Sequence, residues 1–122
     1  MDSLSSFKCV PCSSEVPPLE EQEIQKYLRE VPNWKVAKIE GVPRLENTYT
    51  FKNFREALDF TNQVGEVAEE EGHYPAILCE WGKVTVSGWT HKIRGLHPND
   101  FIMAAKTDQL YQSRQQKVTA SA

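Results

Sequence analysis

The sequence contains few cysteines, no excess of positive charge and no long apolar run. Three cysteines in 122 residues are too few for the dense cross-linking of small secreted scaffolds. No apolar run approaches the roughly 20 residues of a membrane-spanning helix. The formal net charge is −3, without the basic surplus with which proteins contact nucleic-acid phosphates. These shortages argue against a disulfide scaffold, a membrane protein and a protein that binds nucleic acid directly.

The start of the chain also lacks a targeting signal. The residues MDSLSSFK contain neither the hydrophobic core of a secretory signal nor the Arg-rich pattern of a transit peptide. We therefore expect a cytoplasmic protein. Residence in an organelle is the alternative if a transit peptide has been removed.

Cys9 and Cys12 form a CxxC pair in a segment rich in Pro and Ser. A structural zinc site needs about four ligands, and the sequence has no second CxxC and no HxxxH pair. A redox pair would be expected at a helix start after a strand. The context favours a reduced pair without function over a redox pair, and no metal site is expected.

The length and the periodicity predict one domain with one core. Helical spacing and strand alternation give the order helix, strand, strand, helix, strand, strand, helix. Short connections favour antiparallel strands, and such an order gives a two-layer α+β fold with three helices on one face of a four-stranded sheet. The expected helices are residues 19–30, 53–71 and 98–111, and the expected strands are 34–39, 44–51, 76–81 and 83–90.

We expect the domain to cover residues 19–112, between an irregular N-terminal arm over 1–18 and a polar C-terminal tail over 113–122. Trp34 is expected in the core, and Trp81 in the core or in the wall of a cleft. The expected buried stripe of the helix over 53–71 is Phe54, Ala57, Leu58, Thr61, Val64, Gly65 and Ala68.

Two of the three histidines lie at the ends of predicted elements. His73 follows the long helix, and His91 closes the last strand. Asp100 lies in the first turn of the last helix, where His97 is expected to be a cap. Side chains at element ends can converge on one cleft, and two histidines beside a carboxylate suit proton transfer. From spacing alone, ordinary caps and surface residues are the alternative.

The same stretch resembles the signature of the pterin-4a-carbinolamine dehydratases, in particular their bacterial and plant members. The KCVPC and VPPL segments near the start and the Phe51–Phe54 run also resemble that family. The signature positions span 32 residues, and every one is met: Glu69, His73, Tyr74, Pro75, Trp81, His91 and Asp100.

The resemblance implies an enzyme that dehydrates 4a-hydroxytetrahydropterin to quinonoid dihydropterin, in the recycling of tetrahydrobiopterin or a related pterin. The pterin is the substrate, so neither a cofactor nor a metal is implied. The family also contains dimerisation and assembly factors, so a non-catalytic role with a protein partner is the alternative. A homodimer or homotetramer is implied in either case.

The resemblance also implies roles for single residues. His73, Tyr74, His91 and Asp100 are the expected catalytic residues, with Tyr74 at a position that holds a second histidine in many members. Tyrosine is a poor base at neutral pH, which leaves the division of labour open. Asp100 is expected to orient His91, and Glu69 to orient His73 from one helical turn away. The expected substrate-binding residues are Glu69, Gly72, His73, Tyr74, Trp89, Thr90, His91 and Lys92.

Overall fold

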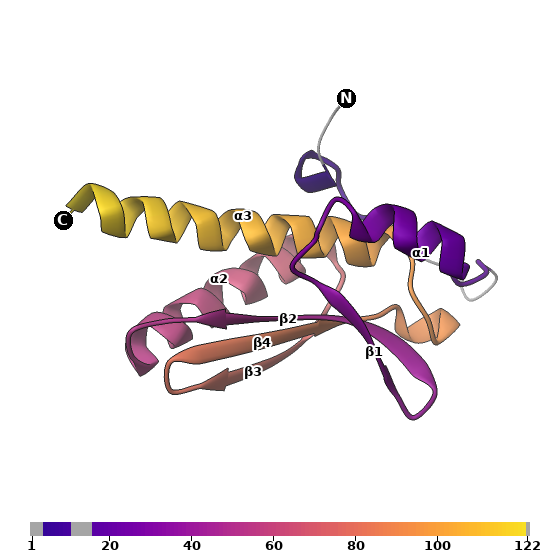
Figure 1. The fold of residues 1–122 in the computed structure, drawn as a ribbon, viewed down its shortest axis with the longest axis horizontal. Coiled ribbons are helices and arrows are strands. Elements are labelled where there is room, and N and C mark those ends of the chain that lie inside the picture. Colours follow the sequence, from indigo (N-terminus) through magenta and orange to yellow (C-terminus); the bar gives the residue numbers. More distant parts are fainter. Residues whose placement is uncertain (1–3, 11–15, 122) are drawn as a thin grey trace.

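The computed structural model describes residues 4–10 and 16–121, with side chains up to residue 114. Three α-helices of this described part cover one face of a four-stranded antiparallel sheet (Figure 1). The strand order is β1-β2-β4-β3. The expected α+β fold is confirmed. The elements are η1 (Leu4–Ser6), α1 (Glu21–Leu28), β1 (Lys35–Ile39), β2 (Val42–Thr50), α2 (Phe54–Glu71), β3 (Ala76–Glu80), β4 (Lys83–Gly88), η2 (His91–Ile93) and α3 (Pro98–Ser121).

Several element ends differ from the prediction, most of them by one or two residues, and two of the differences change the interpretation of the chain. β4 stops at Gly88, and His91 begins the short helix η2 instead of closing the strand. The chain turns here because Arg94 takes a left-handed conformation, with φ of 50°, and Thr90 bridges back to Gly95. At the other end of the chain, α3 continues to residue 121, so the predicted polar tail is helical that far. No described helix combines the length and the apolar character that a membrane span requires.

The core lies between the sheet and the helices α2 and α3. Leu45 and Val84 of adjacent strands belong to one buried cluster with Phe60 of α2 and Phe101 of α3, and all four residues are fully buried. Burial of each such side chain stabilises the fold by roughly 1.5–3 kcal/mol. The observed buried stripe of α2 is Ala57, Phe60, Val64 and Ala68.

The prediction was wrong for two aromatic side chains. Phe54, expected in the buried stripe, is 45% exposed at the first turn of α2, and Phe60 takes the core position instead. Trp81, expected in the core or a cleft wall, is 72% exposed. β3 ends at Glu80, so Trp81 enters the hairpin turn with Gly82 and leaves the inner face of the sheet.

A polar contact fixes α3 to the sheet within the core. Asp108 of α3 accepts hydrogen bonds from the Tyr49 hydroxyl at 2.5 Å and from Nε1 of Trp34 at 2.9 Å. Both donors belong to buried residues, and Trp34 lies in the core as predicted. Burial and the nearby carboxylate raise the pKa of Tyr49 above its usual range, so the phenol remains a donor.

We predict that Asp108→Ala lowers the free energy of unfolding by about 1–3 kcal/mol, because it leaves the two buried donors unpaired. Urea unfolding followed by circular dichroism measures this loss. Gln109→Ala, an exposed change at the next position of the same helix, is the control and should cost under about 0.5 kcal/mol. Equal losses in the two variants would contradict the prediction.

Candidate active site

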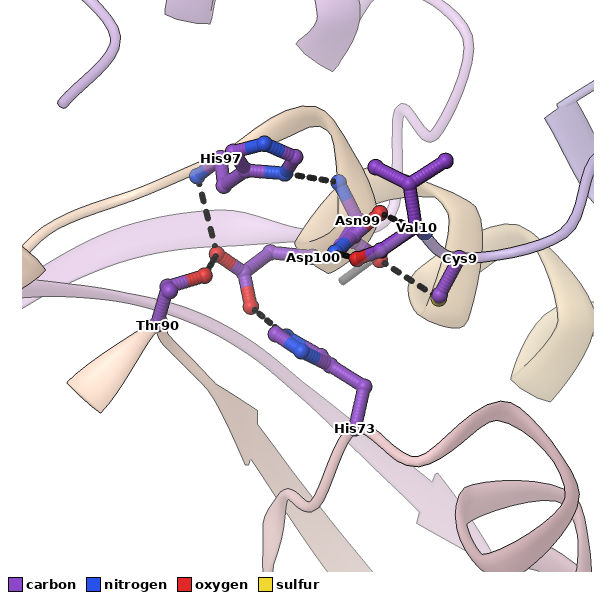
Figure 2. Close-up of polar contacts among 7 residues, drawn as sticks. All are labelled: Cys9, Val10, His73, Thr90, His97, Asn99 and Asp100. Carbon is purple, nitrogen blue, oxygen red and sulfur yellow. Dashed lines mark hydrogen bonds and ion pairs between the residues drawn. The ribbon is translucent and has the colours of Figure 1, made fainter. Parts of the chain in front are cut away.

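The end of α2 positions His73. Gly72 has a φ of 65°, a left-handed conformation that glycine adopts without strain. The backbone N–H groups of Gly72 and His73 both donate to the carbonyl of Ala68, which closes the last turn of the helix. The chain therefore leaves the helix axis at Gly72, and the His73 side chain points towards the start of α3 (Figure 2).

The first turn of α3 positions Asp100. Its Oδ2 accepts the His97 backbone N–H at 3.0 Å, while Nδ1 of His97 accepts the Asn99 backbone N–H at 3.0 Å. The His97 side chain thus accepts a free N–H of the first turn of α3, and Asp100 of the same turn accepts the His97 backbone N–H. The prediction that His97 caps the helix is confirmed. The hydroxyl of Thr90 also donates to Oδ2, at 2.9 Å. These bonds fix the carboxylate and leave Oδ1 directed at His73.

Asp100 and His73 form a close pair. Nε2 of His73 lies 2.6 Å from Oδ1 of Asp100, whose residue is only 2% exposed (Figure 2). Three segments of the chain thus direct donors at one buried carboxylate: the end of α2, the segment after β4 and the start of α3. A carboxylate in this position fixes the ring orientation and the tautomer of its histidine.

Both carboxylate–histidine pairings predicted from the sequence were therefore wrong. Asp100 contacts His73 and not His91, because β4 ends early and His91 turns away in η2. Glu69 does not contact His73, because α2 ends before His73 and the one-turn spacing no longer applies. Glu69 is exposed and borders a separate depression along α2 that does not include the histidines.

His91 is held by ring stacking. Its ring lies on Trp89, with the ring centroids 4.3 Å apart and the planes inclined by 28°. The guanidinium carbon of Arg44 lies 3.9 Å from the centroid of Trp89 and adds a cation–π contact. Stacking holds the imidazole by its face, so this contact uses neither of its ring nitrogens.

The two histidines meet at a cleft of about 700 Å³. Seven of the eight residues predicted to bind substrate line this cleft, and Glu69 is the one that does not. Asp100 is absent from the lining and is connected to the cleft by its bond with His73. The lining residues are Cys9, Val10, Glu71, Gly72, His73, Tyr74, Trp89, Thr90, His91 and Lys92.

Sequence reasoning missed three lining residues, Cys9, Val10 and Glu71. Cys9 and Val10 belong to the predicted irregular arm, and only the KCVPC resemblance singled them out. Burial and the nearby Glu71 raise the pKa of the Cys9 thiol to about 12, which disfavours the thiolate at neutral pH. Cys12 lies outside the described residues. Within the described ranges, no three His, Cys, Asp or Glu side chains are grouped to hold a metal ion.

Comparisons with known proteins agree on one family. Residues 17–110 match the family model described as pterin 4 alpha carbinolamine dehydratase. A curated relative from Chlorobium luteolum is 53% identical over 112 residues, which cover 92% of this chain and 98% of the relative. One from Nitrosococcus oceani is 54% identical over 110 residues, covering 90% and 97%. Both carry the name pterin-4-alpha-carbinolamine dehydratase as a provisional assignment.

A solved structure shares the fold. The transcriptional coactivator/pterin dehydratase from Brucella melitensis superposes with a TM-score of 0.69 at 29% identity. The match covers 76% of this chain and 97% of that chain.

The buried cap predicts a pH dependence of stability. Burial lowers the pKa of His97 below its ordinary value of 6.5; Asp100 opposes this shift and His73 adds to it. As the pH falls below about 6.5, the unfolded chain binds a proton at His97 before the folded chain does. The free energy of unfolding therefore decreases as the pH falls through this window. The stability contributed by the neutral His97 side chain is fully present above the window.

His97→Asn keeps an acceptor for the Asn99 N–H but does not titrate. We predict that its free energy of unfolding declines less than that of the wild type between about pH 7 and pH 5. Urea unfolding at several pH values measures both declines. Parallel declines would show that His97 does not contribute to the acid sensitivity.

Proposed function

This chain belongs to the pterin-4a-carbinolamine dehydratase family, and we propose that it dehydrates a 4a-hydroxytetrahydropterin to the quinonoid dihydropterin and water. The observation that carries the proposal is the cleft in which His73, backed by Asp100, and the stacked His91 lie together. The reaction would serve the recycling of tetrahydrobiopterin or a related pterin.

The reaction needs one acid and one base. The bond between C4a and the hydroxyl oxygen breaks, and the hydroxyl takes up a proton and leaves as water. A ring N–H loses a proton, and the nitrogen lone pair forms a new carbon–nitrogen double bond. No electrons are gained or lost, so the proposal invokes neither a cofactor nor a metal. Positioned acid and base groups typically accelerate such a step by about 10²–10⁴-fold.

We assign the base to His73. A carboxylate only accepts hydrogen bonds, so Asp100 favours the tautomer in which Nε2 of His73 carries the proton. Nδ1 then keeps its lone pair and is available to take the ring N–H proton. The imidazolium that results is stabilised by the carboxylate at 2.6 Å.

We assign the acid to His91. It is an exposed residue of the cleft lining, and the Trp89 ring holds its plane. A protonated His91 can pass a proton to the departing hydroxyl. Tyr74, which is 53% exposed at the same cleft, is placed to donate a hydrogen bond to that hydroxyl or to the pterin ring. The main-chain groups of 72–74 and 89–92 complete the proposed pterin site.

The first test is the dehydration of chemically generated 4a-hydroxytetrahydropterin, followed by absorbance. The wild type should accelerate it, and His73→Ala and His91→Ala should each lose on the order of 10²-fold in rate. Circular dichroism of each variant checks that the fold is retained. A wild type no faster than buffer would overturn the dehydratase assignment.

The role of Asp100 is tested separately. Asp100→Asn can place an amide N–H donor where the carboxylate oxygen accepted a hydrogen bond from His73. This change disfavours the His73 tautomer that carries its proton on Nε2. We expect kcat to fall roughly tenfold or more, with a smaller change in KM. Asp59→Asn makes the same chemical change on α2, outside the cleft lining, and should retain full activity. A kcat unchanged in Asp100→Asn would contradict the positioning role.

A second role, association with another protein chain, has its own observation. β3 is an edge strand, and it carries Leu78 at 58% exposure, followed by Trp81 at 72%. Exposed edges and apolar side chains of this kind favour pairing with another chain. We propose that a second copy of the chain pairs at this edge, in a homodimer or homotetramer, and that a protein partner is the alternative occupant.

Sedimentation velocity tests the association. The wild type should sediment as an oligomer. Leu78→Lys should contain a larger fraction of monomer than the wild type, because a charge on the edge strand opposes pairing. Ile39→Lys, at 38% exposure on the opposite edge strand β1, is the matched control and should leave the distribution unchanged. A monomeric wild type at micromolar concentration would exclude the homo-oligomer.

A further inference from the structure

The N-terminal arm forms one wall of the cleft. Cys9 and Val10 line it together with the end of α2 and the segment that follows β4. The match to the family model begins only at residue 17, so these two lining residues lie outside it. The family-matched part of the chain supplies the histidines, and the arm supplies a wall without acid or base groups.

Asn99 holds the arm by its main chain. Oδ1 of Asn99 accepts the Val10 backbone N–H at 3.0 Å, and Nδ2 donates to the Val10 carbonyl at 2.7 Å (Figure 2). The side-chain amide thus pairs with both polar groups of one residue, as a neighbouring strand would. Asn99 is only 2% exposed, so this pairing is shielded from water.

A second set of contacts ties the arm to α2 and α3. The Cys9 backbone N–H donates to Oε1 of Glu71 at 2.7 Å. Lys106 of α3 lies 3.9 Å from the other Glu71 oxygen and donates to the carbonyl of Ser5 at 2.9 Å. The Leu4 side chain is buried in the core cluster. Residues 4–10 of the arm are therefore anchored at Leu4, Ser5, Cys9 and Val10, which fixes their position at the cleft.

The anchors leave the Val10 side chain free to meet a ligand. Its main-chain groups pair with Asn99, while the residue is 57% exposed overall and lines the cleft. An aliphatic side chain can recognise a ligand by shape and apolar contact but cannot exchange a proton. The ring system is common to all pterins, whereas the substituent at C6 varies between them in size and in its number of hydroxyl groups. Val10 can contact the carbon atoms of that substituent and can limit its size.

We propose that the arm is a specificity determinant, in which Val10, beside Cys9, contacts the C6 substituent and sets which pterins the cleft admits. This inference rests on the proposed function for its substrate class. It concerns binding and selectivity, whereas His73 and His91 account for the rate of the chemical step.

The test compares two stable tetrahydropterins, one with a methyl group and one with a dihydroxypropyl group at C6. Anaerobic titration calorimetry measures both dissociation constants without any turnover. Val10→Trp narrows the cleft and should weaken binding of the larger pterin about tenfold more than that of the smaller one. Val10→Ala should change the ratio of the two dissociation constants in the opposite direction. Phe7→Ala, on the same arm but outside the cleft lining, should leave the ratio unchanged.

A second variant tests the anchor. Asn99→Asp still accepts the Val10 N–H but places an oxygen opposite the Val10 carbonyl, so the arm loses one of its two bonds. A negative charge in the first turn suits the N-terminal end of α3, so the helix should persist in circular dichroism. We expect the ratio of the two dissociation constants to move towards one. A ratio unchanged in this variant and in both Val10 variants would overturn the inference.

Failure of the inference and failure of the proposed function give different results. Arm-dependent selectivity without dehydration of either 4a-hydroxypterin would overturn the enzyme assignment and support the arm. Dehydration by the wild type with an unchanged selectivity ratio in all three variants would support the enzyme assignment and overturn the proposed role of the arm. A wild type that binds neither pterin would overturn both.

Discussion

The buried carboxylate of Asp100 is the group on which the site depends. A carboxylate removed from water is costly unless its oxygens are hydrogen-bonded. Here three donors from three segments satisfy it, and the N-terminal end of α3 adds a favourable dipole. The bonds that stabilise the charge also bring the end of α2, the segment after β4 and the start of α3 together. Helix capping and the orientation of His73 are thus two effects of one side chain.

The rest of the site follows from where rigid elements end. Gly72 ends α2 in a left-handed turn, and β4 ends before His91. Each histidine is therefore held by a different physical contact, His73 by a hydrogen bond with Asp100 and His91 by stacking on Trp89. The two rings face different surroundings, a buried carboxylate and an open aromatic surface. This asymmetry is the physical basis for giving them different roles in the proposed reaction.

Periodicity and caps predicted the fold because they are local. Asn53 and Gly72 mark the ends of α2, and alternation placed Leu45 and Tyr49 on the buried face of β2. Seven of the ten residues that line the cleft were found by resemblance, but the side-chain pairings were not. Spacing along a helix gave Glu69 as the neighbour of His73, whereas the partner is Asp100, 27 positions away in sequence. The role of the arm was not predictable for the same reason, since Val10 and Asn99 pair across 89 positions.

Asn99 and Asp100 are adjacent in sequence, and each holds a different part of the cleft wall. From the first turn of α3, Asn99 holds the arm and Asp100 holds His73. The wall proposed to contact the C6 substituent and the histidine proposed as the base are therefore both held by one rigid element, the first turn of α3. A change that loosens this turn would alter selectivity and rate together, whereas a change in Val10 would alter selectivity alone. This common anchor lets the arm sequence vary without moving the pair of His73 and Asp100, because Asp100 is bonded to His73, Thr90 and His97, which all belong to the body of the domain.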